Sequence, residues 1–78
     1  MSPPPILTAV QFRMAKAALG LSNPQVSELT GLHRNTLNKL DRGDATQGTL
    51  ALVRHALEAA GVEFIAENGG GPGVRLRK

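Results

Sequence analysis

The sequence of 78 residues contains no cysteine, no tryptophan and no tyrosine. The absence of cysteine excludes a disulfide framework and a metal site built from thiolates. The only aromatic residues are Phe12 and Phe64, so the core must consist mainly of Leu, Val, Ile and Ala. A chain of this length buries only about 60–65% of its unfolded surface, which predicts one domain of marginal stability. Oligomerisation commonly stabilises a domain of this size.

Long apolar runs and a strong excess of one charge are also missing. No stretch reaches the roughly 18 apolar residues of a membrane span, and the opening "MSPPPIL" lacks the basic region of a signal peptide. We therefore expect a cytoplasmic protein with no membrane association. The nine Lys and Arg residues against six Asp and Glu give a net charge of +3. This balance is compatible with nucleic-acid binding but does not demonstrate it.

Few residues could support catalysis. The two histidines, His33 and His55, lie in different predicted segments, and neither has a cluster of acidic residues around it. The segment "GGGPG" lacks the lysine and the serine or threonine of a phosphate-binding loop, and no helix follows it. We therefore expect no enzyme activity, no metal site and no cofactor.

Glycines mark the ends of the helices that the sequence predicts. Helical periodicity and capping signals predict helices over about 8–19, 23–30, 34–42 and 49–60, each followed directly by a glycine. Thr8 with Gln11, and Ser22 with Gln25, have the spacing of a capping box. In the first helix we expect a core-facing stripe that consists of Val10, Met14, Ala17, Ala18 and Leu21, widened by Phe12, Ala15 and Leu19.

The last predicted helix has an unusually wide apolar face. Leu50, Val53, Leu57 and Ala60 line it, and Leu52, Ala56 and Ala59 extend it to about half the circumference. A typical surface helix needs a stripe of only about 100°. The extra width indicates a second burial partner, for which a dimer interface is the natural candidate.

The C-terminal segment changes from helical to alternating periodicity. "VEFI" (62–65) and "VRLRK" (74–78) alternate around the loop "AENGGGPG", which predicts a β-hairpin with Glu63 across from Arg75 or Arg77. A frayed tail is the alternative, because an isolated hairpin is marginal in water. The predicted organisation is a flexible leader (1–7), a helical domain (8–61) and a hairpin (62–78) that packs on the domain or lies at a dimer interface.

The segments 23–30 and 34–42 have the spacing of a helix-turn-helix unit. Ser27 provides a small residue where the two helices would cross, and Gly31, four residues later, permits a left-handed turn. The apolar residues that would hold the helices together are Val26, Leu29, Leu32, Leu37 and Leu40.

On these residues, "LSNPQVSELTGLHRNTLNKLDRG" (21–43) resembles the helix-turn-helix core of the Cro/phage-repressor-like (Xre-type) regulators. The resemblance extends over about 8–60 and implies a mainly α, compact four-helix, lambda-repressor-like domain that binds operator DNA, usually as a dimer. It also implies that Lys16 pairs with Asp41. Asn23 departs from the glutamine usual in the family, which touches the DNA backbone, and Ser27 departs from the usual alanine. Members often have a fifth helix where this chain has the predicted hairpin, so the family pattern implies no role for it.

In such a unit the second helix enters the major groove, where Arg and Lys read guanine and Asn reads adenine. The expected base contacts are Arg34, Asn35, Asn38 and Lys39. The expected phosphate contacts are Ser22, Asn23, His33, Thr36, Arg42 and Thr46. A polar helix of this length is, without the turn pattern, usually only a solvated face.

Two functions remain as hypotheses. The first is a sequence-specific DNA-binding transcriptional regulator, a repressor or autoregulator, which binds inverted-repeat operator DNA as a homodimer. The second is a protein-binding regulator on the same scaffold, an antiactivator or an antitoxin-like protein. The basic and amide residues of segment 34–42 favour the first.

Overall fold

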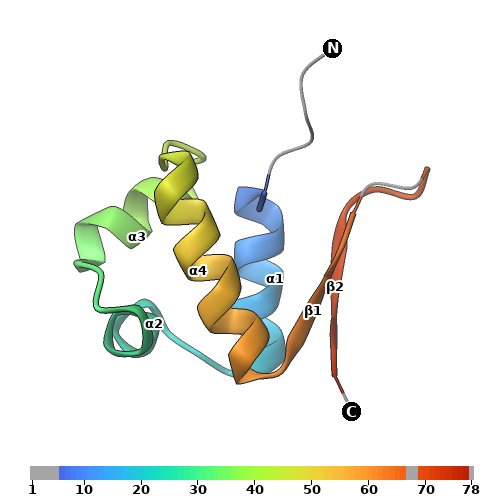
Figure 1. The fold of residues 1–78 in the computed structure, drawn as a ribbon, viewed down its shortest axis with the longest axis horizontal. Helices are drawn as coiled ribbons and strands as arrows, with labels where there is room; N and C mark the ends of the chain where they lie inside the picture. The colour runs from blue at the N-terminus through green and yellow to red at the C-terminus, as the bar shows by residue number, and fades with distance from the viewer. Residues whose placement is uncertain (1–5, 67–68, 78) are drawn as a thin grey trace.

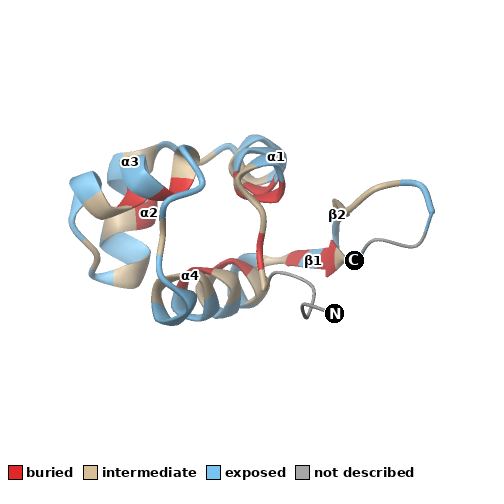
Figure 2. Ribbon diagram, turned by 90° about the horizontal axis from the view of Figure 1, so that it is seen from above, coloured by how far each residue is buried: buried red, intermediate tan, exposed pale blue. Residues whose placement is uncertain are grey.

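The computed structural model describes residues 6–66 and 69–77. Four helices are followed by a two-stranded antiparallel sheet (Figure 1). The elements are α1 (Ala9–Leu19), α2 (Asn23–Thr30), α3 (Arg34–Asp41), α4 (Gln47–Ala60), β1 (Val62–Ile65) and β2 (Gly73–Leu76). The prediction of a mainly helical fold with a C-terminal hairpin is confirmed. Figures 1 and 2 place α2 and α3 at one end of the molecule and the hairpin at the other.

The helix ends follow from capping chemistry. Both predicted capping boxes form, so Thr8 precedes α1 and Ser22 precedes α2. The fourth helix begins at Gln47, two residues before the predicted start, because the hydroxyl of Thr46 accepts a hydrogen bond from the N–H of Thr49. The third helix ends at Asp41, one residue earlier than predicted.

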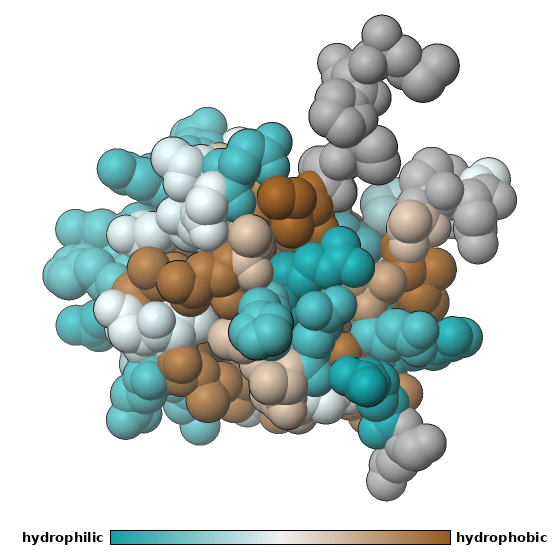
Figure 3. Space-filling model, in the orientation of Figure 1, coloured by the Kyte–Doolittle hydropathy of each residue, from teal (hydrophilic) through white to brown (hydrophobic). Residues whose placement is uncertain are grey.

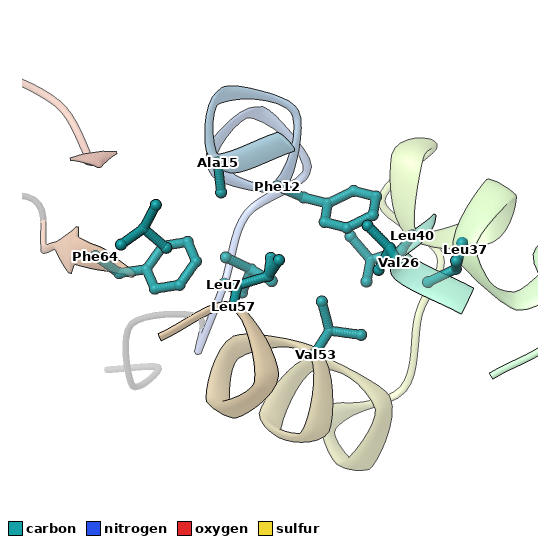
Figure 4. Packing of buried hydrophobic residues seen from close by; sticks show 10 residues of the cluster. Leu7, Phe12, Ala15, Val26, Leu37, Leu40, Val53, Leu57 and Phe64 are labelled. Carbon is teal, nitrogen blue, oxygen red and sulfur yellow. The ribbon is translucent and has the colours of Figure 1, made fainter. Parts of the chain in front are cut away.

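The core lies where the four helices and β1 face one another (Figure 2). Its buried apolar residues are Leu7, Phe12, Ala15, Val26, Leu37, Leu40, Val53, Leu57, Val62 and Phe64. Phe12 extends from α1 toward Val26 and Leu40 (Figure 4). The core thus joins the two helices of the helix-turn-helix unit to the rest of the domain.

The domain begins earlier in the chain than the sequence indicated. Leu7, which we assigned to a flexible leader, is only 2% exposed, and Ile6 packs against the core. The guanidinium of Arg54 donates a hydrogen bond of 2.7 Å to the carbonyl of Ile6 and lies 5.4 Å from the ring centroid of Phe64. Arg54 also forms an ion pair with Glu58 one helical turn later, at 3.2 Å. The rest of the expected leader, 1–5, lies outside the described residues.

The face of α1 that enters the core also differs from the prediction. Val10 is 54% and Met14 38% exposed, whereas Gln11 is only 4% exposed. The side-chain amide of Gln11 donates hydrogen bonds of 3.1 Å to the carbonyls of Ile65 and Gly73. Both strands therefore dock on the polar Gln11 side of α1, which leaves Val10, Met14, Ala17 and Ala18 of the predicted stripe on the surface. The other residues of the predicted face are buried or pack against the core as expected: Phe12, Ala15, Leu19 and Leu21. Leu29, which was expected to face the core, is also exposed. Leu52, which was expected to be buried against a second partner, is 45% exposed in the single chain.

The hairpin packs on α1 and α4, as one of the two predicted arrangements required. Val62 pairs with Leu76, and Glu63 with Arg75, in an antiparallel register. Arg75 Nε donates a hydrogen bond of 2.8 Å to Glu63 Oε1. That hydrogen bond and the positive charge of Arg75 lower the pKa of Glu63. The second strand ends at Leu76, earlier than predicted.

Candidate nucleic-acid interface

Helices α2 and α3 contact each other and form the predicted helix-turn-helix unit. Gly31 has a left-handed backbone (φ 74°), which glycine adopts without steric cost. The hydroxyl of Ser27 donates a hydrogen bond to the carbonyl of Leu32. The hydroxyl of Thr30 donates to the carbonyl of Val26 and accepts from the N–H of Leu32. These contacts hold the turn in one conformation and so fix the direction of α3.

The two sides of α3 differ sharply in exposure. Leu37 and Leu40 are 0% and 1% exposed. The predicted base-contacting residues Arg34, Asn35, Asn38 and Lys39 are all exposed. In Figure 3 the end of the molecule that carries α3 is mostly hydrophilic. The buried leucines therefore anchor a helix whose other side displays basic and amide groups.

Two of the predicted phosphate contacts cap helices. His33 precedes α3, and its Nδ1 accepts a hydrogen bond of 3.0 Å from the N–H of Asn35. An accepting Nδ1 carries no proton, so Nε2 carries it and remains a donor at an exposed position. Thr46 caps α4, and its hydroxyl both accepts from the N–H of Thr49 and donates to the hydroxyl of Thr49.

The other predicted contacts on α3 and after it differ in exposure. Thr36 is half-buried, so its hydroxyl is less accessible to a DNA phosphate than an exposed side chain would be. Arg42 follows α3 with a 62% exposed side chain, and its Nε lies 3.9 Å from a carboxylate oxygen of Asp44. A pair this long and this exposed leaves the guanidinium available to a phosphate.

The start of α2 offers fewer donors than the sequence indicated. The hydroxyl of Ser22 accepts from the N–H of Gln25 and donates to the side-chain oxygen of Gln25. Pro24 has no N–H. The N–H of Val26 donates to the carbonyl of Ser22. This leaves the N–H of Asn23 as the backbone donor of the first turn, while the Ser22 hydroxyl is used within the cap.

Asn23 joins three helices through its side chain. Its Oδ1 accepts a hydrogen bond of 2.7 Å from Lys16 on α1. Its Nδ2 donates to Asp41 Oδ2 at 3.0 Å and to Asn38 Oδ1 at 3.2 Å, both on α3. Lys16 also lies 3.1 Å from Asp41, which is the pair that the family resemblance implied. We call Lys16, Asn23, Asn38 and Asp41 the three-helix network.

The sequence analysis missed the role of Asn23 in this network. The side-chain amide that we assigned to a phosphate is engaged inside the protein. Its partners lie 7, 15 and 18 residues away in the chain, and no local pattern relates residues at those separations. Only the packing of α3 against both α1 and α2 brings these groups together.

No protein-family model matches the sequence, and a search of curated proteins finds no match. Within residues 6–66 and 69–77, no helix has the length and apolar character needed to cross a bilayer. The same residues contain no group of three or more His, Asp or Glu side chains placed to hold a metal ion.

Proposed function

We propose that the protein is a sequence-specific DNA-binding transcriptional regulator, a cytoplasmic repressor or autoregulator. The observation that carries the proposal is the division of α3 between buried Leu37 and Leu40 and an exposed side with Arg34, Asn35, Asn38 and Lys39. A helix fixed on one side and lined with guanidinium, ammonium and amide groups on the other suits insertion into the major groove.

The surrounding groups have the chemistry of phosphate contacts. The Nε2–H of His33 and the guanidinium of Arg42 lie at the two ends of α3, where the phosphate backbones border the groove. The first N–H groups of α4, next to its cap Thr46, are further donors. Such contacts position the protein without reading sequence, whereas Arg34 and Lys39 supply donors for guanine O6 and N7.

We also propose that the protein binds DNA as a homodimer with half-sites about 34 Å apart in an inverted repeat. The apolar stripe of α1, with Val10 and Met14 at its centre, is exposed in the single chain. Leu76 on the neighbouring strand β2 is 48% exposed. Because the hairpin lies at the end opposite α3, a contact through this face leaves both copies of α3 unobstructed (Figure 1).

Selection of binding sequences from a randomised pool of duplex DNA, at about 150 mM salt, tests the proposal. An enriched inverted repeat is expected, and its affinity should fall steeply with salt because phosphate contacts release counterions. Lys39→Ala should lower discrimination at one base position by about 1–3 kcal/mol, whereas Arg42→Ala should weaken binding to all sequences alike. Equal weakening of all sequences by both variants would refute the base-reading assignment, and a pool without enrichment would favour the protein-binding alternative.

A further inference from the structure

The three-helix network contains two groups whose hydrogen-bonding roles cannot be exchanged. The ammonium of Lys16 can only donate, and the carboxylate of Asp41 can only accept. Asn23 lies between them, with Oδ1 2.7 Å from the ammonium and Nδ2 3.0 Å from the carboxylate. Rotation of the Asn23 amide by 180° would set two donors against each other on one side and two acceptors on the other. The orientation of Asn23 is therefore determined by its partners.

This orientation fixes the amide of Asn38 in turn. The second N–H of Asn23 Nδ2 points to Asn38, at 3.2 Å, so the atom that faces it must be an acceptor. Oδ1 of Asn38 is consequently turned toward Asn23, and Nδ2 is turned away from it on the exposed side of α3. Among the described residues, no group accepts a hydrogen bond from this Nδ2.

An asparagine that reads adenine in the usual bidentate way needs both amide atoms. Its Nδ2 donates to N7, and its Oδ1 accepts from the N6 amino group. In this chain one lone pair of Asn38 Oδ1 accepts from Asn23, which turns the oxygen toward α2 and leaves Nδ2, a donor, as the amide atom turned away from Asn23. A donor finds acceptors in the major groove at the N7 of either purine, at guanine O6 and at thymine O4.

We infer that Asn38 reads a hydrogen-bond acceptor in the major groove rather than adenine specifically, and that Asn23 is the positioning residue that imposes this preference. The inference rests on the proposed DNA-binding function. It assigns Asn23 a role in base preference, although its own side-chain amide is hydrogen-bonded to Lys16, Asn38 and Asp41.

The test begins with the selected DNA sequence. The base position read by Asn38 is the one whose preference is lost in Asn38→Ala. At that position, loss of the acceptor should weaken binding by roughly three- to tenfold, the worth of one hydrogen bond. For adenine the test is replacement of N7 by carbon, and for guanine it is separate replacement of N7 and of O6, one of which should weaken binding. If the base is adenine, removal of its N6 amino group should leave the affinity unchanged. If it is thymine, replacement of O4 by sulfur, a poorer acceptor, should weaken binding.

The variant Asn23→Ala tests the positioning role. Without the Asn23 donor, the Asn38 amide can rotate and use both atoms, so the preference at this one position should shift toward adenine by roughly threefold or more. A purely structural role of Asn23 would lower affinity for all sequences and leave the pattern of preferences as it was. Asn35→Ala is the matched control, since Asn35 is an exposed asparagine of the same helix, and it should alter a different position.

Asn38→Asp provides a second test that preserves the contact with Asn23. The aspartate accepts from Asn23 as before but offers only acceptors to the groove, so the preference should move to cytosine, whose N4 amino group donates. Dependence on the N6 amino group in the wild type, or an unchanged preference in Asn23→Ala, would overturn the inference while the proposed function stands. A protein that selects no sequence at all would overturn both.

Discussion

The ammonium of Lys16 on α1 lies 3.1 Å from the carboxylate of Asp41 on α3, and it lies 4.2 Å from the ring centroid of Phe12. The two charged side chains are only 14% and 27% exposed. A pair this far removed from water differs from an ion pair at the surface, because loss of one partner leaves the other charge poorly solvated.

We therefore expect Asp41→Ala to lower the free energy of unfolding by about 1–3 kcal/mol. The matched control is Asp44→Ala, because Asp44 is 69% exposed and lies 3.9 Å from Arg42. That variant should cost less than about 0.5 kcal/mol. Urea unfolding measures both, and equal losses would show that burial of the Lys16 pair contributes nothing.

Gln11 is the polar residue that joins the hairpin to α1 through two backbone carbonyls. Replacement by leucine keeps the approximate volume but leaves the carbonyls of Ile65 and Gly73 without this donor. We expect a loss of about 1–3 kcal/mol and faster hydrogen exchange of the amides in β1 and β2. Gln47→Leu, at an exposed position of α4, should change the stability by less than about 0.5 kcal/mol. Unchanged exchange in Gln11→Leu would contradict the role given to this residue.

How far the sequence predicts the structure depends on the range of the interactions. Helix positions follow from caps and glycines within a few residues, so Ser22, Gly31 and the leucines of α3 behave as expected. The core-facing side of α1 was predicted only in part: Phe12 and Ala15 are buried as expected, but hydrophobicity alone wrongly favours Val10 over Gln11. The partners that bury Gln11 lie 54 and 62 residues away.

The candidate site shows the same contrast between features set by nearby residues and features set by contacts between distant parts of the chain. The exposure of Arg34 and Lys39 follows from the spacing of the leucines, a local property of α3. The network around Asn23 does not follow from any local spacing, because it depends on how three helices pack against one another. Donor and acceptor roles in such a network are set jointly by all its members.

Leu7 is a core residue of the domain, contrary to the sequence-based assignment to a leader. Leu7→Ala should lower the free energy of unfolding by about 2–4 kcal/mol, the usual cost of removing a buried leucine side chain. Leu52→Ala, in which the side chain is already 45% exposed, should cost less than about 1 kcal/mol. Thermal and urea unfolding give both values, and a neutral effect of Leu7→Ala would restore the leader assignment.

The contact between Glu63 and Arg75 predicts a pH dependence of hairpin stability. Arg75 lowers the pKa of Glu63 in the folded state below the ordinary value of 4.5. A carboxyl with a lowered folded pKa contributes stability above its unfolded pKa and loses it as the pH falls through the folded value. The difference in melting temperature between wild type and Glu63→Gln should therefore be present at about pH 6 and shrink as the pH falls below 4.5 and through the lowered pKa of Glu63. A difference that persists unchanged as the pH falls through this pKa would exclude the charge of Glu63 as its source.

The exposed stripe of α1 predicts where two copies of the protein meet. The sequence places Val10, Met14, Ala17 and Ala18 on one side of this helix, and the hairpin covers the other side instead. Burial against a second copy would remove this apolar surface from water at roughly 25 cal/mol per Å². Met14→Glu should then raise the dissociation constant of the dimer by about tenfold or more without unfolding the chain, because Met14 is exposed in the monomer.

The matched control is Leu52→Glu on α4, which places the same charge on the wide apolar face from which the sequence predicted an interface. Sedimentation equilibrium over a range of protein concentrations measures both variants against the wild type. Dissociation by Met14→Glu alone assigns the interface to α1 and the neighbouring strand. Dissociation by Leu52→Glu alone would return it to α4, and a monomeric wild type at micromolar concentration would require DNA to bring the two copies together.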